Sequence, residues 1–158
     1  FFIIELESRR VVHFGVTRFP SDVWLAQQWR NASSFEEGPR FPIRDNDKKF
    51  GAHFADVTDN IGILKTPVRA PQANAVCERF IGSVRRECLD HVIILNERHL
   101  RRLVREYVGS FNRARPHQGI DCIPNPPETA RNAAAPTDQP VIAVPVLGGL
   151  HHDYQRTA

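Results

Sequence analysis

Residues 43–50 read IRDNDKKF, a short apolar strand followed by a turn that begins with the carboxylate of Asp45. Residues 69–80 read RAPQANAVCERF, a loop that runs into a helix displaying a second carboxylate, Glu78. Hard divalent cations such as Mg²⁺ take oxygen ligands, and one acid at a strand end and another on a helix can provide them. The two segments together therefore predict a metal site on a fold that contains both strands and helices.

Each acid also has an ordinary interpretation when it is taken alone. Asp45 precedes the turn residues Asn46 and Asp47, and its carboxylate can simply cap that turn. Glu78 can be a solvated side chain that pairs with a neighbouring arginine on its helix. For either residue alone the ordinary interpretation is favoured, so only their joint occurrence favours a site.

Local patterns predict alternating strands and helices that form one mixed sheet with helices packed on it. The expected elements are, in order, a hairpin over 1–7 and 10–16, a helix opening at 20–22, a strand over 41–45, a weak helix over 51–60, a strand over 63–66 and a helix from 72 or 73 to about 89. Ser21 or Asp22 is the expected cap of the first helix. Trp24 and Trp29 on that helix are expected to be core residues.

The last helix has the clearest pattern. Asn96 is its expected cap, and Pro116 prevents its continuation. Its apolar stripe has helical spacing and consists of Leu100, Leu103, Val104, Tyr107, Val108 and Phe111. In the preceding helix the apolar row is Val76, Phe80, Val84 and Cys88. Both rows predict one buried face for each helix.

Length and composition limit the class of protein. With 158 residues, of which 41% are hydrophobic, the chain can bury one core, and we expect one domain. The chain has no Met and starts with Phe, so we expect a fragment or a processed product. The first four apolar residues are too few for a signal peptide or a membrane span. The three cysteines include no CxxC pair, and a cytoplasmic protein with reduced thiols is expected.

Positive charge is concentrated in one part of the chain. The net charge is only +3, but residues 65–115 hold eleven Lys and Arg against five Asp and Glu. Such local basicity favours a phosphate backbone as partner. The ordinary alternative is a solvated helix face.

Three segments resemble those of the DDE transposases of bacterial insertion sequences and the retroviral-type integrases. Residues 45–50 are similar to the family's Asp-Asn-Gly-x-x-Phe segment, although Asp47 stands where glycine is usual. Residues 71–79 match its Pro-Gln-x-Asn-Gly-x-x-Glu-Arg pattern, although Ala75 replaces a glycine. Residues 112–117 resemble its Asn-x-x-Arg-Pro-His segment, and the 33 positions between Asp45 and Glu78 also fit the family.

The resemblance implies a partial catalytic core over residues 1–123, with an RNase H-like fold whose first strand, carrying the family's first Asp, is missing. It implies that Asp45 and Glu78 are catalytic metal ligands for Mg²⁺ or Mn²⁺, and that DNA is the substrate in transposition or integration. The residues expected to contact DNA are Lys65, Arg79, Arg85 and Arg86. The full-length relatives are expected to act as homo-oligomers away from any membrane.

The missing acid leaves alternatives open. Two carboxylates cannot hold the two ions that such chemistry uses, so the chain by itself is expected to be inactive. Glu5 and Glu7 can be proposed as substitutes, but solvated strand positions are favoured for both. The alternative function is a non-catalytic remnant that keeps the RNase H-like fold and binds DNA weakly.

A third class, a purely structural or protein-interaction module, is supported only by the end of the chain. Residues 124–158 are rich in proline and predict an extended C-terminal tail, ordered at most at 141–144. His151 and His152 in this tail are expected to be structural or disordered rather than metal ligands. His117 can equally contact a phosphate or cap a turn.

Overall fold

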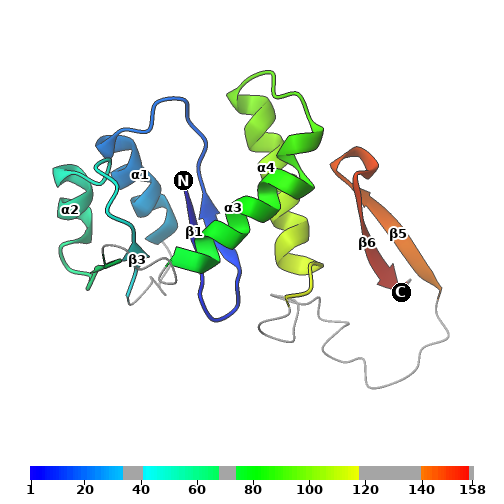
Figure 1. Cartoon of the computed structure of the whole chain (residues 1–158), viewed down its shortest axis with the longest axis horizontal. Helices are drawn as coiled ribbons and strands as arrows, with labels where there is room; N and C mark the ends of the chain where they lie inside the picture. The colour runs from blue at the N-terminus through cyan, green and yellow to red at the C-terminus, as the bar shows by residue number, and fades with distance from the viewer. Residues whose placement is uncertain (34–40, 68–73, 118–139, 157–158) are drawn as a thin grey trace. The chain divides into compact units, whose positions relative to one another are not determined.

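The computed structural model describes residues 1–33, 41–67, 74–117 and 140–156, and it confirms the α/β class (Figure 1). The first part contains strand β1 (Phe2–Ile4), strand β2 (Val11–Phe14), helix α1 (Asp22–Ser33), strand β3 (Ile43–Arg44), helix α2 (Ala52–Thr58) and strand β4 (Leu64–Lys65). The second contains helix α3 (Ala75–Glu87), the 3₁₀ turn η2 (Leu89–His91), helix α4 (Glu97–Arg113), strand β5 (Val141–Val146), the 3₁₀ turn η3 (Leu147–Gly149) and strand β6 (His151–Arg156).

The strands pair more locally than the sequence predicted. The described strands form three two-stranded sheets, β1–β2, β3–β4 and β5–β6, in place of one mixed sheet. Strands β3 and β4 are parallel, with Ile43 opposite Leu64 and Arg44 opposite Lys65. Each of these strands is only two residues long, which limits the pairing that it can contribute to a wider sheet. The RNase H-like arrangement therefore remains a prediction.

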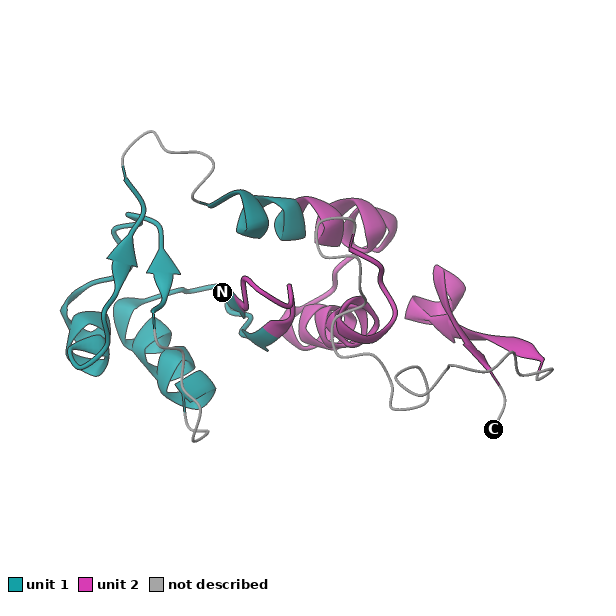
Figure 2. Ribbon diagram, turned by 90° about the horizontal axis from the view of Figure 1, so that it is seen from below, with its two compact units in different colours: residues 1–3, 12–81 teal, residues 4–11, 82–158 magenta. Residues whose placement is uncertain are grey.

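The chain divides into two compact units (Figure 2). Unit 1 comprises Phe1–Ile3 and Val12–Ile81, and unit 2 comprises Ile4–Val11 and Gly82–Ala158. Helix α3 contributes its first half to unit 1 and its second half to unit 2. The boundary predicted between 123 and 124 lies outside the described residues and stays a prediction.

Aromatic packing between α1 and α2 forms the core of unit 1. Leu25, Trp29 and Phe54 are buried, and Phe50 and Trp24 pack against this cluster. The Trp29 and Phe54 rings meet edge to face at 5.9 Å, a favourable geometry for aromatic pairs. The predicted core role of Trp29 is confirmed, and Trp24 is partly buried beside it.

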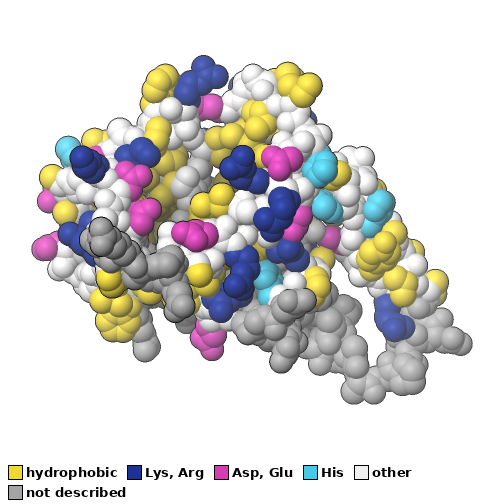
Figure 3. All heavy atoms as spheres, in the orientation of Figure 1, with side chains coloured by type: hydrophobic (Ala, Val, Ile, Leu, Met, Phe, Trp, Pro, Cys, Tyr) yellow, Lys and Arg dark blue, Asp and Glu magenta, His cyan; other side chains and the backbone are white. Residues whose placement is uncertain are grey.

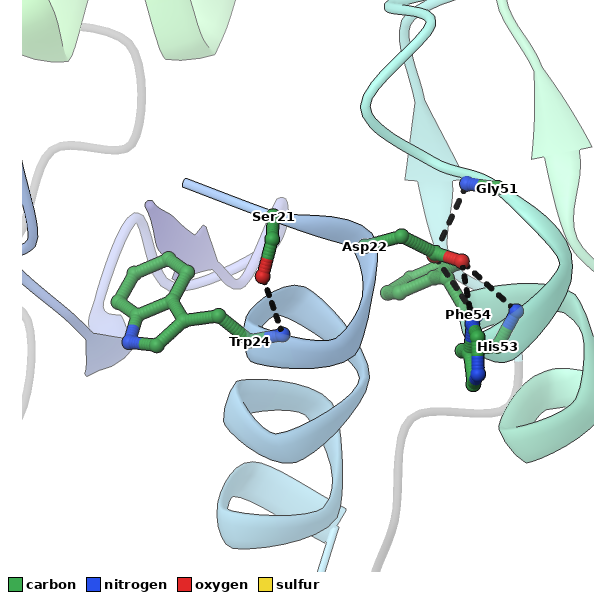
Figure 4. A network of polar contacts seen from close by, with 6 residues as sticks. All are labelled: Ser21, Asp22, Trp24, Gly51, His53 and Phe54. Atoms are coloured by element: carbon green, nitrogen blue, oxygen red, sulfur yellow. Dashed lines mark hydrogen bonds and ion pairs between the residues drawn. The ribbon is translucent and has the colours of Figure 1, made fainter. Parts of the chain in front are cut away.

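One carboxylate joins the starts of α1 and α2 (Figure 4). Ser21 caps α1, because its Oγ accepts a hydrogen bond from the Trp24 amide at 3.2 Å. Helix α2 begins after Gly51, which has no side chain to act as a cap. Asp22 supplies the missing acceptor by taking the amides of Gly51, His53 and Phe54 at 2.9, 2.8 and 2.9 Å. Three of the free amides at the start of α2 are thereby satisfied from another helix.

These hydrogen bonds also lower the pKa of the Asp22 carboxyl. Desolvation would raise the pKa of its carboxyl, but the bonds from Phe54, His53 and Gly51 outweigh it and hold the pKa below its ordinary value. The His53 ring adds a further contact at 3.1 Å. The charged form of Asp22 is therefore the form that caps α2.

Helices α3 and α4 bury the faces that the sequence predicted. In α4, Leu103, Tyr107, Val108 and Phe111 are buried. The cap is also confirmed, since Asn96 Oδ1 accepts from the His99 amide at 2.9 Å. In the α3 row, Phe80, Val84 and Cys88 are buried and Val76 is half-buried.

The end of the chain is more ordered than predicted. Strands β5 and β6 form an antiparallel hairpin that pairs Val141 with Arg156 and Val146 with His151. Gly148 and Gly149 turn the chain with φ of 67° and 95°, a region that glycine adopts without strain. The prediction of order only at 141–144 is therefore wrong, because it overlooked a Gly-Gly turn between two strands.

Within unit 2, polar contacts attach this hairpin to helices α3 and α4. Ser110 Oγ donates to Asp153 Oδ1 at 2.6 Å, and the Leu147 amide donates to Glu106 Oε1. The His151 ring contacts the Glu87 carbonyl, which gives this histidine the structural role expected of it.

Of the helices that the structure describes, none has both the length and the apolar character required to cross a membrane.

We predict that Asp22→Ala loosens the start of α2. The amides of Gly51, His53 and Phe54 lose their acceptor, so hydrogen exchange at these amides should accelerate while exchange in α4 stays unchanged. NMR-detected exchange measures this. Because the folded pKa of Asp22 is lowered, its contribution is complete above about pH 4, the unfolded value, and is lost as pH falls through the folded pKa.

The matched control is Asp56→Ala, which removes an exposed acid from α2 that takes no part in this cap. Equal exchange rates at Gly51 and Phe54 in the Asp22 variant and the wild type would contradict the cap.

Candidate active site

Asp45 lies directly after strand β3, at the end of the parallel pair with β4. The pairing extends by two further bonds, from the Leu64 amide to the Pro42 carbonyl and from the Thr66 amide to the Arg44 carbonyl, both 2.9 Å. Asn46 Nδ2 donates to the Thr66 carbonyl at 2.8 Å and ties the turn to the end of β4. The acid is therefore exposed on a turn whose backbone is held on both sides.

The remaining residues of this segment are engaged within the turn itself. Asp45 Oδ1 accepts from the Asp47 amide at 3.2 Å, the turn contact that its ordinary interpretation requires. Asp47 accepts from the Lys49 amide at 2.9 Å and forms an ion pair with Lys49 Nζ at 3.2 Å. The Arg44 guanidinium lies 4.8 Å from the centre of the Phe50 ring. Asp47 is thus neutralised locally, whereas Asp45 keeps a second carboxylate oxygen beyond its turn contact.

Glu78 lies in the first turn of α3 and is exposed. A negative charge is favourable there because the helix dipole places partial positive charge at the N-terminus. The predicted loop residues Pro71, Gln72 and Ala73 lie outside the described residues.

Cys77 shows that Asp45 and Glu78 lie in one neighbourhood of unit 1. Burial is the largest cause that raises the pKa of the half-buried Cys77 thiol, followed by the charge of Asp45 and then that of Glu78. A charge acts in this way only on a group close to it, because water and salt screen distant charges. Two acids 33 positions apart in the sequence therefore act on one thiol.

This arrangement fits part of a divalent-cation site. Carboxylate oxygens are suitable ligands for Mg²⁺ or Mn²⁺, and Asp45 and Glu78 are two exposed carboxylates of unit 1. The described residues contain no group of three or more His, Cys, Asp or Glu side chains that could hold a metal ion. That Asp45 and Glu78 share one ion stays a prediction.

The four predicted DNA-contacting side chains are all exposed. Lys65 lies on β4, and Arg79, Arg85 and Arg86 lie on α3. Figure 3 shows Lys and Arg side chains gathered over the region that α3 occupies in Figure 1. Gly82 gives the Arg86 side chain room, since a Cβ at this glycine would lie 3.0 Å from Arg86 Nη1. These positions are compatible with contact to a polyanion.

The third family-like segment has a structural part that the sequence did not reveal. Asn112 on α4 holds the backbone of Val11 by two bonds, accepting from its amide and donating to its carbonyl, both at 2.9 Å. Such a pair satisfies both polar groups of one strand residue and fixes the helix against the strand. Val11 itself is buried.

Arg115 joins α3 to the end of α4. It forms an ion pair with Glu87 and donates to Ser83 Oγ at 3.2 Å, while its guanidinium lies 5.4 Å from the centre of the Phe111 ring. The Tyr107 hydroxyl donates to Glu87 Oε2 at 2.7 Å. Burial, followed by this bond to Glu87, raises the pKa of Tyr107 and keeps it protonated.

His117 packs against the Phe111 ring, which the Arg115 guanidinium also approaches. Its ring lies 4.8 Å from Phe111 in an edge-to-face geometry. Burial, followed by the charge of Arg115, lowers the pKa of His117, so the neutral form is favoured. A neutral, packed imidazole favours the structural interpretation of this residue over phosphate contact.

Comparison with known proteins agrees with the sequence resemblance. Residues 60–124 match the family described as integrase core domain, a range that includes Glu78 and the segment 112–117. A protein of Xanthomonas euvesicatoria named insertion element IS476 uncharacterized 39.2 kDa protein is 28% identical over 152 residues, which are 94% of this chain and 43% of that protein. The chain thus spans less than half the length of this relative. No solved structure matches the chain significantly.

The resemblance to an integrase core of the transposase type is therefore confirmed. Sequence reasoning missed Cys77 as a neighbour of the two acids, although its place beside Glu78 in the sequence was a signal. It also missed the contacts of Asn112 and Arg115, whose partners lie far away in the sequence.

We predict that neutralising the two acids makes Cys77 more reactive. With Asp45→Asn and Glu78→Gln combined, the thiolate loses two repelling charges, so the pKa of Cys77 falls and its alkylation at mildly alkaline pH accelerates. Alkylation by iodoacetamide in EDTA, followed by mass spectrometry, measures this. Cys88, which is fully buried, serves as the internal control. An alkylation rate that depends on neither acid would place them away from Cys77.

Proposed function

We propose that this chain is the part of a transposase catalytic core that supplies two carboxylates, Asp45 and Glu78, to a divalent cation for the cutting and joining of DNA. The proposed fold of the complete core is RNase H-like. The family match over residues 60–124 supports this reaction class. The proposed ion is Mg²⁺, with Mn²⁺ as a substitute, because both accept carboxylate oxygens.

The observation that carries the proposal is that both acids lie within electrostatic range of one group, the Cys77 thiol. Asp45 at the end of β3 and Glu78 at the start of α3 both act on the Cys77 thiol, and both are exposed. Like charges that meet in this way repel each other, and a bound cation removes that repulsion. The neighbouring Asp47 already has its charge offset by an ion pair with Lys49.

The chain's own residues would then orient a phosphodiester at the ion. When bound, a divalent cation polarises phosphoryl oxygens and offsets the charge that develops on them. Asp45 is fixed by the β3–β4 pairing and Glu78 by the first turn of α3, so neither ligand depends on a long loop for its position. Rigid placement of this kind is what precise ligand geometry requires.

We also propose that Lys65, Arg79, Arg85 and Arg86 position the DNA backbone. All four are exposed, and Arg79 follows Glu78 directly on α3. Contacts from Lys and Arg to phosphates fix register and orientation without reading sequence.

A non-catalytic remnant is the second candidate. The observation that favours it is the lack of a third acid at the site among the described residues. Such a protein would bind DNA through the same basic residues but would not hold a metal ion at Asp45 and Glu78. Metal binding therefore separates the two candidates.

We predict weak binding of Mn²⁺ to the chain, with a dissociation constant on the order of 10⁻³ M because only two side chains contribute. Asp45→Asn or Glu78→Gln should each weaken binding tenfold or more, since even outer-shell changes around metals cost about 10–100-fold. The electron paramagnetic resonance signal of free Mn²⁺ measures this. Asp47→Asn is the matched control and should bind as the wild type does. Unchanged binding in the Asp45 and Glu78 variants would favour the remnant.

We predict that Arg85→Ala combined with Arg86→Ala weakens DNA binding and its dependence on salt. Each phosphate contact contributes about 0.9 to the slope of log K against log salt concentration, so the slope should fall by up to about two. Fluorescence anisotropy of a labelled duplex between about 50 and 200 mM salt measures this. Arg85→Lys combined with Arg86→Lys keeps both charges, so this control variant should keep the slope. A slope that survives the double alanine change would remove this part of α3 from the DNA surface.

A further inference from the structure

Helix α4 carries an arginine face that the proposed function does not use. The face consists of five exposed side chains, Arg98, Arg101, Arg102, Arg105 and Arg113. At about 100° per residue they lie within an arc of about 120°, on the side of the helix away from the buried Leu103, Tyr107 and Phe111. Gly109 and Asn112 lie in the same arc, and the other side chains of the arc are basic. A helix with one apolar face and one mainly basic face has a surface suited to a polyanion.

Four of the five arginines on this face have no ion pair within the described residues. They are Arg98, Arg102, Arg105 and Arg113. Four guanidinium groups on one helix face repel one another, and nearby carboxylates are the ordinary remedy. Because these four arginines form no ion pair in the part of the chain that the structure describes, an external anion is favourable at this face.

The carboxylates nearest in the fold are engaged elsewhere. Glu106, four residues after Arg102, accepts from the Leu147 amide of the C-terminal hairpin. Glu87 is held by Arg115 and Tyr107, and Asp153 by Ser110. On α4 itself the other acid is Glu97 in the first turn, where it faces the helix N-terminus.

Gly109 lies in the middle of the arc and shapes it. A Cβ at this glycine would lie 3.4 Å from Arg113 Nη1, so the Arg113 side chain lies back along the helix over the glycine. The guanidinium is thereby brought toward Arg105 instead of extending beyond the end of α4. The same arrangement occurs on α3, where Arg86 lies over Gly82.

We propose that the arginine face of α4 binds the sugar–phosphate backbone of duplex DNA, as a second contact surface that uses no residue of the metal site. Arg98 and Arg113 are about 22 Å apart along the helix axis, at 1.5 Å per residue. Over that length along its axis, duplex B-form DNA carries about 13 phosphates, one per about 1.7 Å. Four guanidinium groups on one helix face, each able to donate two parallel bonds to a phosphate, can contact several of them.

The test is DNA binding by the full chain in EDTA, so the result is independent of metal and of Asp45 and Glu78. Arg102→Ala combined with Arg105→Ala should lower the slope of log K against log salt by about two and weaken binding about tenfold or more near 50 mM salt. Alanine is a good helix former at exposed positions, and circular dichroism confirms that α4 is retained. Fluorescence anisotropy with a labelled random-sequence duplex is the measurement.

Two controls make the outcome decisive. Arg102→Lys combined with Arg105→Lys keeps the charge and should retain the slope. Adding the alanine changes at Arg85 and Arg86 should lower the slope further, because they belong to a separate surface. An unchanged slope in the folded α4 alanine variant would overturn the proposal. Binding of labelled polyglutamate as tight as that of DNA would also overturn it and would indicate an acidic protein partner.

Discussion

In unit 1, the start of helix α2 depends on the hydrogen bonds that the Asp22 carboxylate accepts. One carboxylate at the start of α1 satisfies three backbone amides at the start of α2, where Gly51 offers no cap of its own. It anchors the chain immediately after the segment 45–50, while the pairing of β3 with β4 anchors it before that segment. The turn that displays Asp45 is therefore held at both ends, and a ligand-bearing turn requires such support.

The charge pattern around this turn explains why a cation is the natural partner. Asp47 has Lys49, Glu87 has Arg115 and Asp22 has a set of backbone donors. Asp45 and Glu78 instead approach the same thiol and raise its pKa. In the proposed function, a divalent ion would offset the negative charge of these two acids. The exposed arginines of α3 and α4 carry the opposite charge, which in the proposed function a phosphate backbone would offset.

Local sequence was a good guide where contacts are local. The apolar stripe of α4 and its Asn96 cap depend on spacing along one helix, and both were predicted. The long-range cap by Asp22, the hold of Asn112 on Val11 and the hairpin contacts to α4 join residues tens of positions apart, so no local pattern reveals them. Of the site, the two acids could be named from the family-like segments, but the effect of Asp45 on Cys77 could not, because it depends on the fold.

The central claim is that Asp45 and Glu78 share one cation. A crystal soaked in Mn²⁺ and measured for anomalous scattering tests it most directly, because the ion itself gives the signal. The account predicts one peak that contacts a carboxylate oxygen of each acid at about 2.1–2.2 Å. Peaks elsewhere on the protein, with none between Asp45 and Glu78, would contradict it.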